Sequence, residues 1–130
     1  MSSPDSSAIP RSVLAQLLDV VEACDAIGSC LAGVDLDMYC ATRFIRSSVE
    51  REVILIGAAL ASLLRVERDL PRRLPHSRPF VDLGDRLEHG YYAVSRSEVW
   101  SIATDEVPLL RDECRAILAE REGEGEGDED

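Results

Sequence analysis

The sequence predicts an all-α protein, an up-and-down bundle of about five helices in one domain. Apolar residues recur at steps of three and four along most of the chain, and no segment alternates polar and apolar residues as a strand would. Leu, Val, Ile and Ala supply the apolar mass, and aromatic residues are only 5%. A chain of 130 residues can bury one core without disulfides or metals.

The first predicted helix follows a Ser/Pro/Asp-rich leader, residues 1–9, which is expected to be disordered. Pro10 suits a first helical position, and the glycines 28 and 33 bracket the predicted end near Ile27. One face of this helix carries the apolar residues Val13, Leu14, Leu17, Val21 and Cys24.

A long helical pattern runs from Met38 to about Asp69, and Asp35 or Asp37 is the expected N-cap. Ser47 and Ser48 are the predicted division between a short helix and a long one. The long helix carries a seam of apolar residues at steps of four and three: Val49, Val53, Ile56, Leu60 and Leu63.

Prolines at 71, 75 and 79 predict a loop over residues 71–79. A short helix is expected over residues 80–89. Gly90 can end that helix, because glycine adopts the left-handed conformation common after helix ends.

Ser95 or Ser97 is the expected cap of a further helix that begins near Glu98. Pro108 suits the first turn of a last helix over residues 105–121, which places Leu110, Cys114 and Ile117 on one face. The helical domain therefore spans residues 10–119. Residues 120–130 are predicted to be a disordered acidic tail, which either solvates the protein, mimics nucleic-acid charge or covers an Arg-lined site.

Charge and cysteine content narrow the class of protein. The formal net charge is −11, and the segment 120–130 contributes −6 of it through seven acids and one Arg. Every basic residue is Arg, so any phosphate contact must come from guanidinium groups. The four cysteines lack C-x-x-C spacing and are predicted to be reduced core residues. We expect a cytoplasmic protein with no membrane span, no metal and no cofactor.

One block carries a family resemblance: Asp85-Arg86-Leu87-Glu88-His89-Gly90-Tyr91-Tyr92-Ala93-Val94, followed by Glu98-Val99-Trp100 and Val107-Pro108-Leu109-Leu110. This block resembles the HepT-like family of the HEPN superfamily, and the likeness extends over roughly residues 10–119. Proteins of that family are toxins paired with a nucleotidyltransferase antitoxin. Their motif is Arg, four residues, His, any residue and Tyr, at the end of a short helix.

The resemblance implies metal-independent RNA cleavage at the interface of a homodimer. His89 matches the catalytic histidine, which would move a proton on or off the ribose 2′-hydroxyl or the leaving oxygen. Tyr91 matches the tyrosine to which the partner nucleotidyltransferase attaches AMP. RNA and the antitoxin are the implied partners.

The block departs from the family motif at the arginine. Gly84 stands at the motif position, and Ala58 replaces the Glu of the family's Gly-Glu-Ala segment. Arg86, one turn before His89, either substitutes as the phosphate-binding guanidinium or is an ion-paired surface residue. The missing Arg predicts weakened cleavage. The alternative is a catalytically inactive helical dimerisation module that binds the nucleotidyltransferase.

The only basic concentration in the sequence lies between Arg65 and Arg78. Within it, Arg72, Arg73 and Arg78 are predicted contacts for RNA phosphates or for an acidic partner surface. A solvated helix end explains the same residues equally well.

Overall fold

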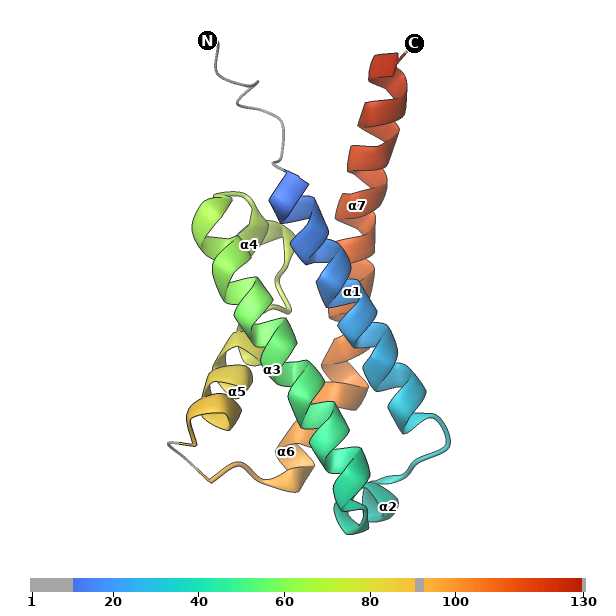
Figure 1. Ribbon diagram of the computed structural model, residues 1–130, viewed down its shortest axis with the longest axis vertical. Helices are drawn as coiled ribbons and strands as arrows, with labels where there is room; N and C mark the ends of the chain where they lie inside the picture. The colour runs from blue at the N-terminus through green and yellow to red at the C-terminus, as the bar shows by residue number, and fades with distance from the viewer. Residues whose placement is uncertain (1–10, 91–92, 130) are drawn as a thin grey trace.

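The protein is a bundle of helices arranged around a long central one (Figure 1). The computed structural model describes residues 11–90 and 93–129, and the side chains of 12–90 and 93–120. No strand occurs in this described part, so the all-α prediction is confirmed. The helices are α1 Arg11–Leu31, α2 Leu36–Ala41, α3 Arg43–Val66, α4 Leu70–Arg73, α5 Arg78–His89, α6 Arg96–Ser101, the π turn η1 Ile102–Glu106 and α7 Val107–Glu129.

Helix α3 occupies the centre and packs against α1 on one side and α5 on the other. Helix α7 packs along α1, and the short α2 contacts both α3 and α6. All five residues of the predicted α3 seam, from Val49 to Leu63, are completely buried. The predicted α7 face is also buried, with Leu110, Cys114 and Ile117 at 1% exposure or less. These two faces confirm the periodicity argument.

The break between α2 and α3 lies at Thr42 and not at the serine pair. Thr42 adopts an extended conformation, φ −113° and ψ 98°, whereas Ser47 and Ser48 remain inside α3. Asp35 caps α2, and its carboxylate accepts a hydrogen bond of 2.8 Å from the Met38 backbone N–H. The prediction of a division at Ser47 and Ser48 was therefore wrong, because serine is tolerated inside a long helix whose apolar face, here from Val49 onward, is buried.

The segment predicted as a loop over residues 71–79 contains helical turns. Pro71 lies in the first turn of α4 and Pro79 in the first turn of α5. A first-turn residue has no intrahelical partner for its N–H, so proline costs nothing there. The prolines begin helices here, and only residues 74–77 connect them.

The last predicted helix is longer than expected and continuous with α6. Residues 102–106 form a π turn in which the Val107 N–H donates to the Ile102 carbonyl oxygen. Pro108 has no N–H and its ring crowds the preceding turn, so a wider turn before it relieves that conflict. Helix α7 continues to Glu129, so the backbone of the expected disordered tail is helical and its last turns extend beyond the bundle (Figure 1). The division of the chain into leader, domain and tail stays a prediction.

Candidate active site at the end of helix α5

The last turn of α5 presents the histidine singled out by the sequence. Phe80, Leu83 and Gly84 are buried against the core, which fixes the orientation of α5. Gly90 then ends the helix with φ 65°, and its N–H donates to the Arg86 carbonyl oxygen at 2.9 Å. His89 is consequently the final residue of α5, on a turn held by the burial of one face and by a glycine cap.

His89 lies on the surface beside a carboxylate. Its side chain is 46% exposed, and its Nε2 lies 3.3 Å from Oδ1 of Asp85, one turn earlier. A carboxylate one turn earlier on the same helix helps to hold the orientation of the imidazole ring. The arrangement suits a histidine that transfers protons. The position of Asp85 beside His89 was not predicted, although the four-residue spacing between them in the sequence is a signal for such a contact.

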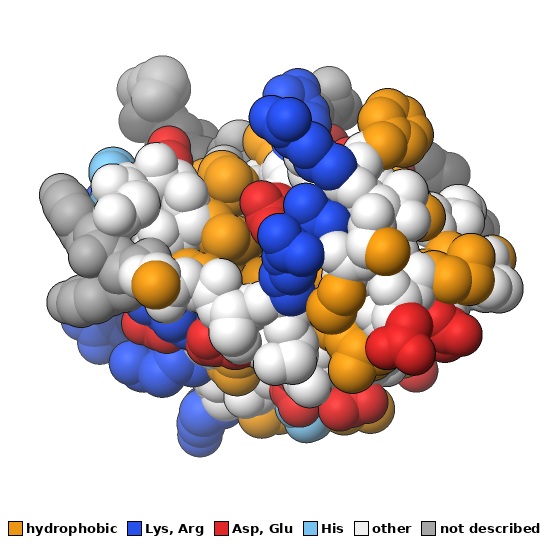
Figure 2. All heavy atoms as spheres, turned by 90° about the horizontal axis from the view of Figure 1, so that it is seen from below, with side chains coloured by type: hydrophobic (Ala, Val, Ile, Leu, Met, Phe, Trp, Pro, Cys, Tyr) orange, Lys and Arg blue, Asp and Glu red, His pale blue; other side chains and the backbone are white. Residues whose placement is uncertain are grey.

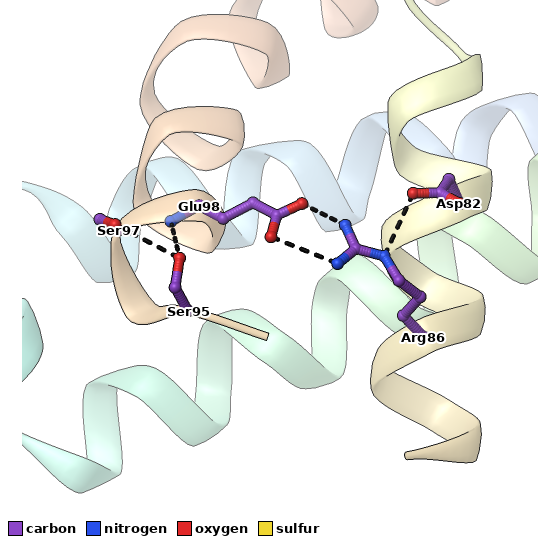
Figure 3. Close-up of polar contacts among 5 residues, drawn as sticks. All are labelled: Asp82, Arg86, Ser95, Ser97 and Glu98. Carbon is purple, nitrogen blue, oxygen red and sulfur yellow. Dashed lines mark hydrogen bonds and ion pairs between the residues drawn. The ribbon is translucent and has the colours of Figure 1, made fainter. Parts of the chain in front are cut away.

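The guanidinium group of Arg86 is paired with carboxylates of its own chain (Figure 3). Its Nε donates to Asp82 at 3.2 Å, while Nη1 and Nη2 both donate to Glu98 on α6, Nη1 at 3.3 Å. The hydrogen bond to Glu98 is the main cause that raises the pKa of Arg86 above its ordinary value. The side chain thus joins α5 to the start of α6. This geometry supports the ion-paired role for Arg86 over the phosphate-binding role.

Helices α3 and α5 cross at two glycines, and one of them stands where the motif arginine was expected. A Cβ on Gly84 would lie 3.2 Å from the Val53 carbonyl oxygen and 3.3 Å from the Gly57 Cα. A Cβ on Gly57 would lie 2.7 Å from the Phe80 carbonyl oxygen. Position 84 therefore faces α3, and a long side chain there requires the two helices to separate.

The comparison with known protein families matches residues 20–117 to a model described as "Ribonuclease HepT-like". The chain belongs to the HepT-like ribonuclease family. The match contains all of α2 to α6 and most of α1, so it includes both the bundle core and the turn that carries His89.

Several relatives of this HepT-like chain come from the archaeon Methanocaldococcus jannaschii. "Putative RNase MJ1216" is 29% identical over 119 residues, which are 89% of this chain and 95% of the relative. "Putative RNase MJ0125" is 28% identical over 115 residues, or 86% of this chain and 96% of the relative. A third, "Gamma-glutamylcyclotransferase and putative RNase MJ0434", is 23% identical over 85% of this chain and 49% of its own length. No solved structure gives a significant match.

The arginines predicted to contact RNA lie away from His89. Arg72 pairs with Asp69 at 3.2 Å, and Arg73 pairs with Glu120 of α7. Arg78 begins α5, about 16 Å of helix rise before His89 in this 12-residue helix. The structure therefore does not bring the three together with the histidine of this HepT-like domain.

A shallow groove of about 420 Å³ runs between α3 and α5. Asp82, Asp85 and Glu88 line it together with Arg78, so its charge is mainly negative. Tyr91, the predicted site of AMP attachment, lies outside the described residues. Within the described part, no three His, Cys, Asp or Glu side chains gather as metal ligands would, and no helix has the length and apolarity to cross a membrane.

Proposed function

We propose that this protein is an RNA endonuclease of the toxin type that cleaves without a metal ion and acts as a homodimer. The observation that supports this most strongly is His89, half-exposed beside Asp85 at the end of α5, within a domain of the HepT-like ribonuclease family. Loss of the motif arginine at Gly84 predicts a slow enzyme, because one missing charge-stabilising donor costs about 10²–10³ in rate.

The chemistry needs only proton transfer and phosphate positioning. A base removes the proton of a ribose 2′-hydroxyl, and the 2′-oxygen attacks the adjacent phosphorus. The bond from phosphorus to the 5′-oxygen breaks, and an acid gives a proton to that leaving oxygen. The products are a 2′,3′-cyclic phosphate and a 5′-hydroxyl, and an imidazole suits both roles near neutral pH.

In the proposed homodimer, two protomers together supply both the general base and the general acid. Each chain contributes a single His89 to the site, whereas base and acid work on opposite sides of the phosphorus. A two-fold arrangement would place the second protomer's copy of His89 near the first, one as base and one as acid. The inward-facing position 84 and the occupied guanidinium of Arg86 favour assistance from outside the protomer.

Cleavage of a single-stranded RNA by the purified protein tests the enzyme. We expect slow cleavage, leaving a cyclic phosphate end, that His89→Ala reduces about 10²–10⁴-fold as removal of a general acid or base does. Glu88→Ala, on the preceding exposed residue, is the matched control and should retain the activity. Equal rates for wild type and His89→Ala would reject catalysis by this site.

The second proposal is an inactive module that binds a nucleotidyltransferase. Two observations favour it: Gly84 packs against α3, and Arg86 is ion-paired with Asp82 and Glu98. It expects a stable dimer and complex formation with no His89-dependent cleavage in the same assay.

The toxin pairing makes a separate prediction about Tyr91. A nucleotidyltransferase antitoxin should transfer AMP from ATP to the Tyr91 hydroxyl and release pyrophosphate, and the attached nucleotide would block access to His89 two residues away. Intact-mass spectrometry after co-expression should find one or more added AMP groups on wild type and fewer on Tyr91→Phe. Tyr92→Phe is the control that should still be modified. Modification of Tyr91→Phe to the same extent would remove the pairing argument.

A further inference from the structure

Two arginines meet at the end of the bundle where α2, α3 and α6 join, and a third lies one helical turn from one of them. Arg46 of α3 and Arg96 of α6 both donate from Nη1 to the carbonyl oxygen of Cys40, at 2.6 and 2.8 Å. Arg43, the first residue of α3, lies one turn before Arg46. The Cys40 carbonyl oxygen, near the end of α2, carries partial negative charge and accepts hydrogen bonds from both guanidinium groups.

These arginines keep their positive charge uncompensated by ion pairs. Among the described residues, no carboxylate pairs with Arg43, Arg46 or Arg96, whereas four other arginines do have carboxylate partners: Arg72, Arg73, Arg86 and Arg111. A chain of net charge −11 has enough acids to neutralise them. A concentrated positive charge on such a chain is suited to an anionic ligand.

Exposed apolar side chains lie beside the arginines. Phe44 is 79% exposed between Arg43 and Arg46 in the sequence, and Met38 of α2 is 46% exposed. Figure 2 shows this end of the molecule, with basic side chains across the middle of the face and hydrophobic ones on both sides. Guanidinium groups and an exposed aromatic ring are the groups that bind single-stranded nucleic acids. The guanidinium groups contact the phosphates, and unpaired bases stack on the aromatic ring.

The same end of the bundle includes the candidate active site. Glu98, the partner of Arg86, lies two residues after Arg96 on α6, and Arg86 lies one turn before His89 on α5. The groove between α3 and α5 is lined by Asp82, Asp85 and Glu88, which repel phosphates, and by a single arginine, Arg78. A strand that reaches His89 therefore has a favourable approach along α6 and an unfavourable one along the α3–α5 groove.

We propose that Arg43, Arg46, Arg96 and Phe44 form the surface that holds single-stranded RNA beside His89, the guanidinium groups on successive phosphates and the Phe44 ring on an unstacked base. The proposal rests on the proposed ribonuclease function and names the residues that would bind its substrate. It assigns RNA binding to residues other than Arg72, Arg73 and Arg78.

Binding is measured separately from cleavage in the His89→Ala protein, by fluorescence anisotropy with a fluorescein-labelled, unstructured RNA oligonucleotide. The test variant changes Arg43, Arg46 and Arg96 to Gln, because a Gln amide can still donate to the Cys40 carbonyl. The control changes Arg65, Arg68 and Arg115 to Gln, which removes the same charge from exposed arginines that pair with no described carboxylate. Circular dichroism melting verifies that both are folded.

We expect the test variant to bind RNA at least about tenfold more weakly than the control. Its plot of log K against log salt should be shallower by about 2, since each lost phosphate contact removes about 0.7 for a single strand. Phe44→Leu should weaken binding about tenfold while Phe44→Tyr preserves it, as expected for base stacking.

Equal RNA affinity of test variant and control overturns the proposal. If wild type still cleaves RNA with dependence on His89 in that case, the proposed function survives the failure. If the test variant alone loses RNA binding but wild type cleaves nothing, the surface stands and the nuclease function fails. A changed sedimentation coefficient with unchanged RNA affinity would assign the surface to protein contacts and likewise overturn the proposal.

Discussion

At the scale of single residues, the role of Arg86 is determined by the carboxylates that pair with it inside its own chain. The sequence allowed Arg86 either a phosphate or a carboxylate partner, and two carboxylates occupy it. The choice depends on Glu98, which lies twelve residues further along the chain and is brought near Arg86 by the tertiary fold. A guanidinium held on three donors by carboxylates does not need a ligand.

Tyr39 is the residue whose environment most directly predicts a measurable effect. It is completely buried, its ring centre lies 5.5 Å from that of Trp100, and its hydroxyl has no hydrogen-bond partner among the described residues. Burial raises the pKa of Tyr39 to about 12. An unpartnered buried hydroxyl costs about 1–3 kcal/mol, which replacement by Phe removes.

Tyr39→Phe should therefore unfold at pH 7 with a free energy equal to wild type or greater by about 1–2 kcal/mol. At pH 11 the gap should widen by about 1 kcal/mol. The unfolded wild type releases the tyrosine proton near pH 10 and the folded form retains it to about 12, so wild-type stability falls over this range. Buried Cys24 and Cys114, whose pKa is also raised to about 12, affect both proteins equally.

Urea unfolding at the two pH values measures this difference. A Tyr39→Phe protein less stable than wild type at pH 7 would show that the hydroxyl has a favourable contact.

At the scale of elements, the crossing of α3 and α5 determines where His89 lies. Both contact positions, Gly57 and Gly84, are glycines, so the two backbones approach more closely than side chains allow. Everything on the outer face of α5, including Asp85 and His89, is placed by this contact. A loss of close packing there moves the candidate site as well as lowering stability.

Gly57→Ala should lower the free energy of unfolding by about 1–2 kcal/mol, because overpacking against the Phe80 carbonyl exceeds the roughly 1 kcal/mol that Ala gains in a helix. Gly84→Ala, with its nearest contact at 3.2 Å, should stay within about 1 kcal/mol of wild type. Gly28→Ala in α1 meets nothing within 4 Å and should be stabilising by up to about 1 kcal/mol.

Chemical denaturation ranks the three variants. If Gly57→Ala were as stable as Gly28→Ala, the helices would have room that the structure does not show.

For the whole molecule, the sequence predicted the fold class, the buried seam of α3 and the short helix ending at Gly90. These follow from local patterns, since burial repeats with the helical period and glycine terminates helices. The element boundaries near prolines and serines were predicted less well, because Pro71 and Pro79 can either break or begin a helix and the neighbouring residues decide which.

The candidate site was predicted only in part. His89 was found because its neighbours in sequence carry the family motif, whereas its Asp85 partner required attention to helical spacing alone. The meeting of Arg46 and Arg96 on one carbonyl had no signal in the sequence, since it depends on how α2, α3 and α6 come together. Contacts between distant segments are products of the tertiary fold, and a linear pattern does not encode them directly.

The π turn at Ile102–Glu106 has a consequence for how the chain tolerates changes in length. A π turn contains one residue more than an α turn, so residues before and after it keep their faces although the chain is longer. The wider turn accommodates Pro108, which has no N–H to donate to the preceding turn. A deletion of one residue within the π turn is thus compatible with the bundle when Pro108 is also replaced, whereas a deletion of one residue within α7 would rotate all that follows by about 100°.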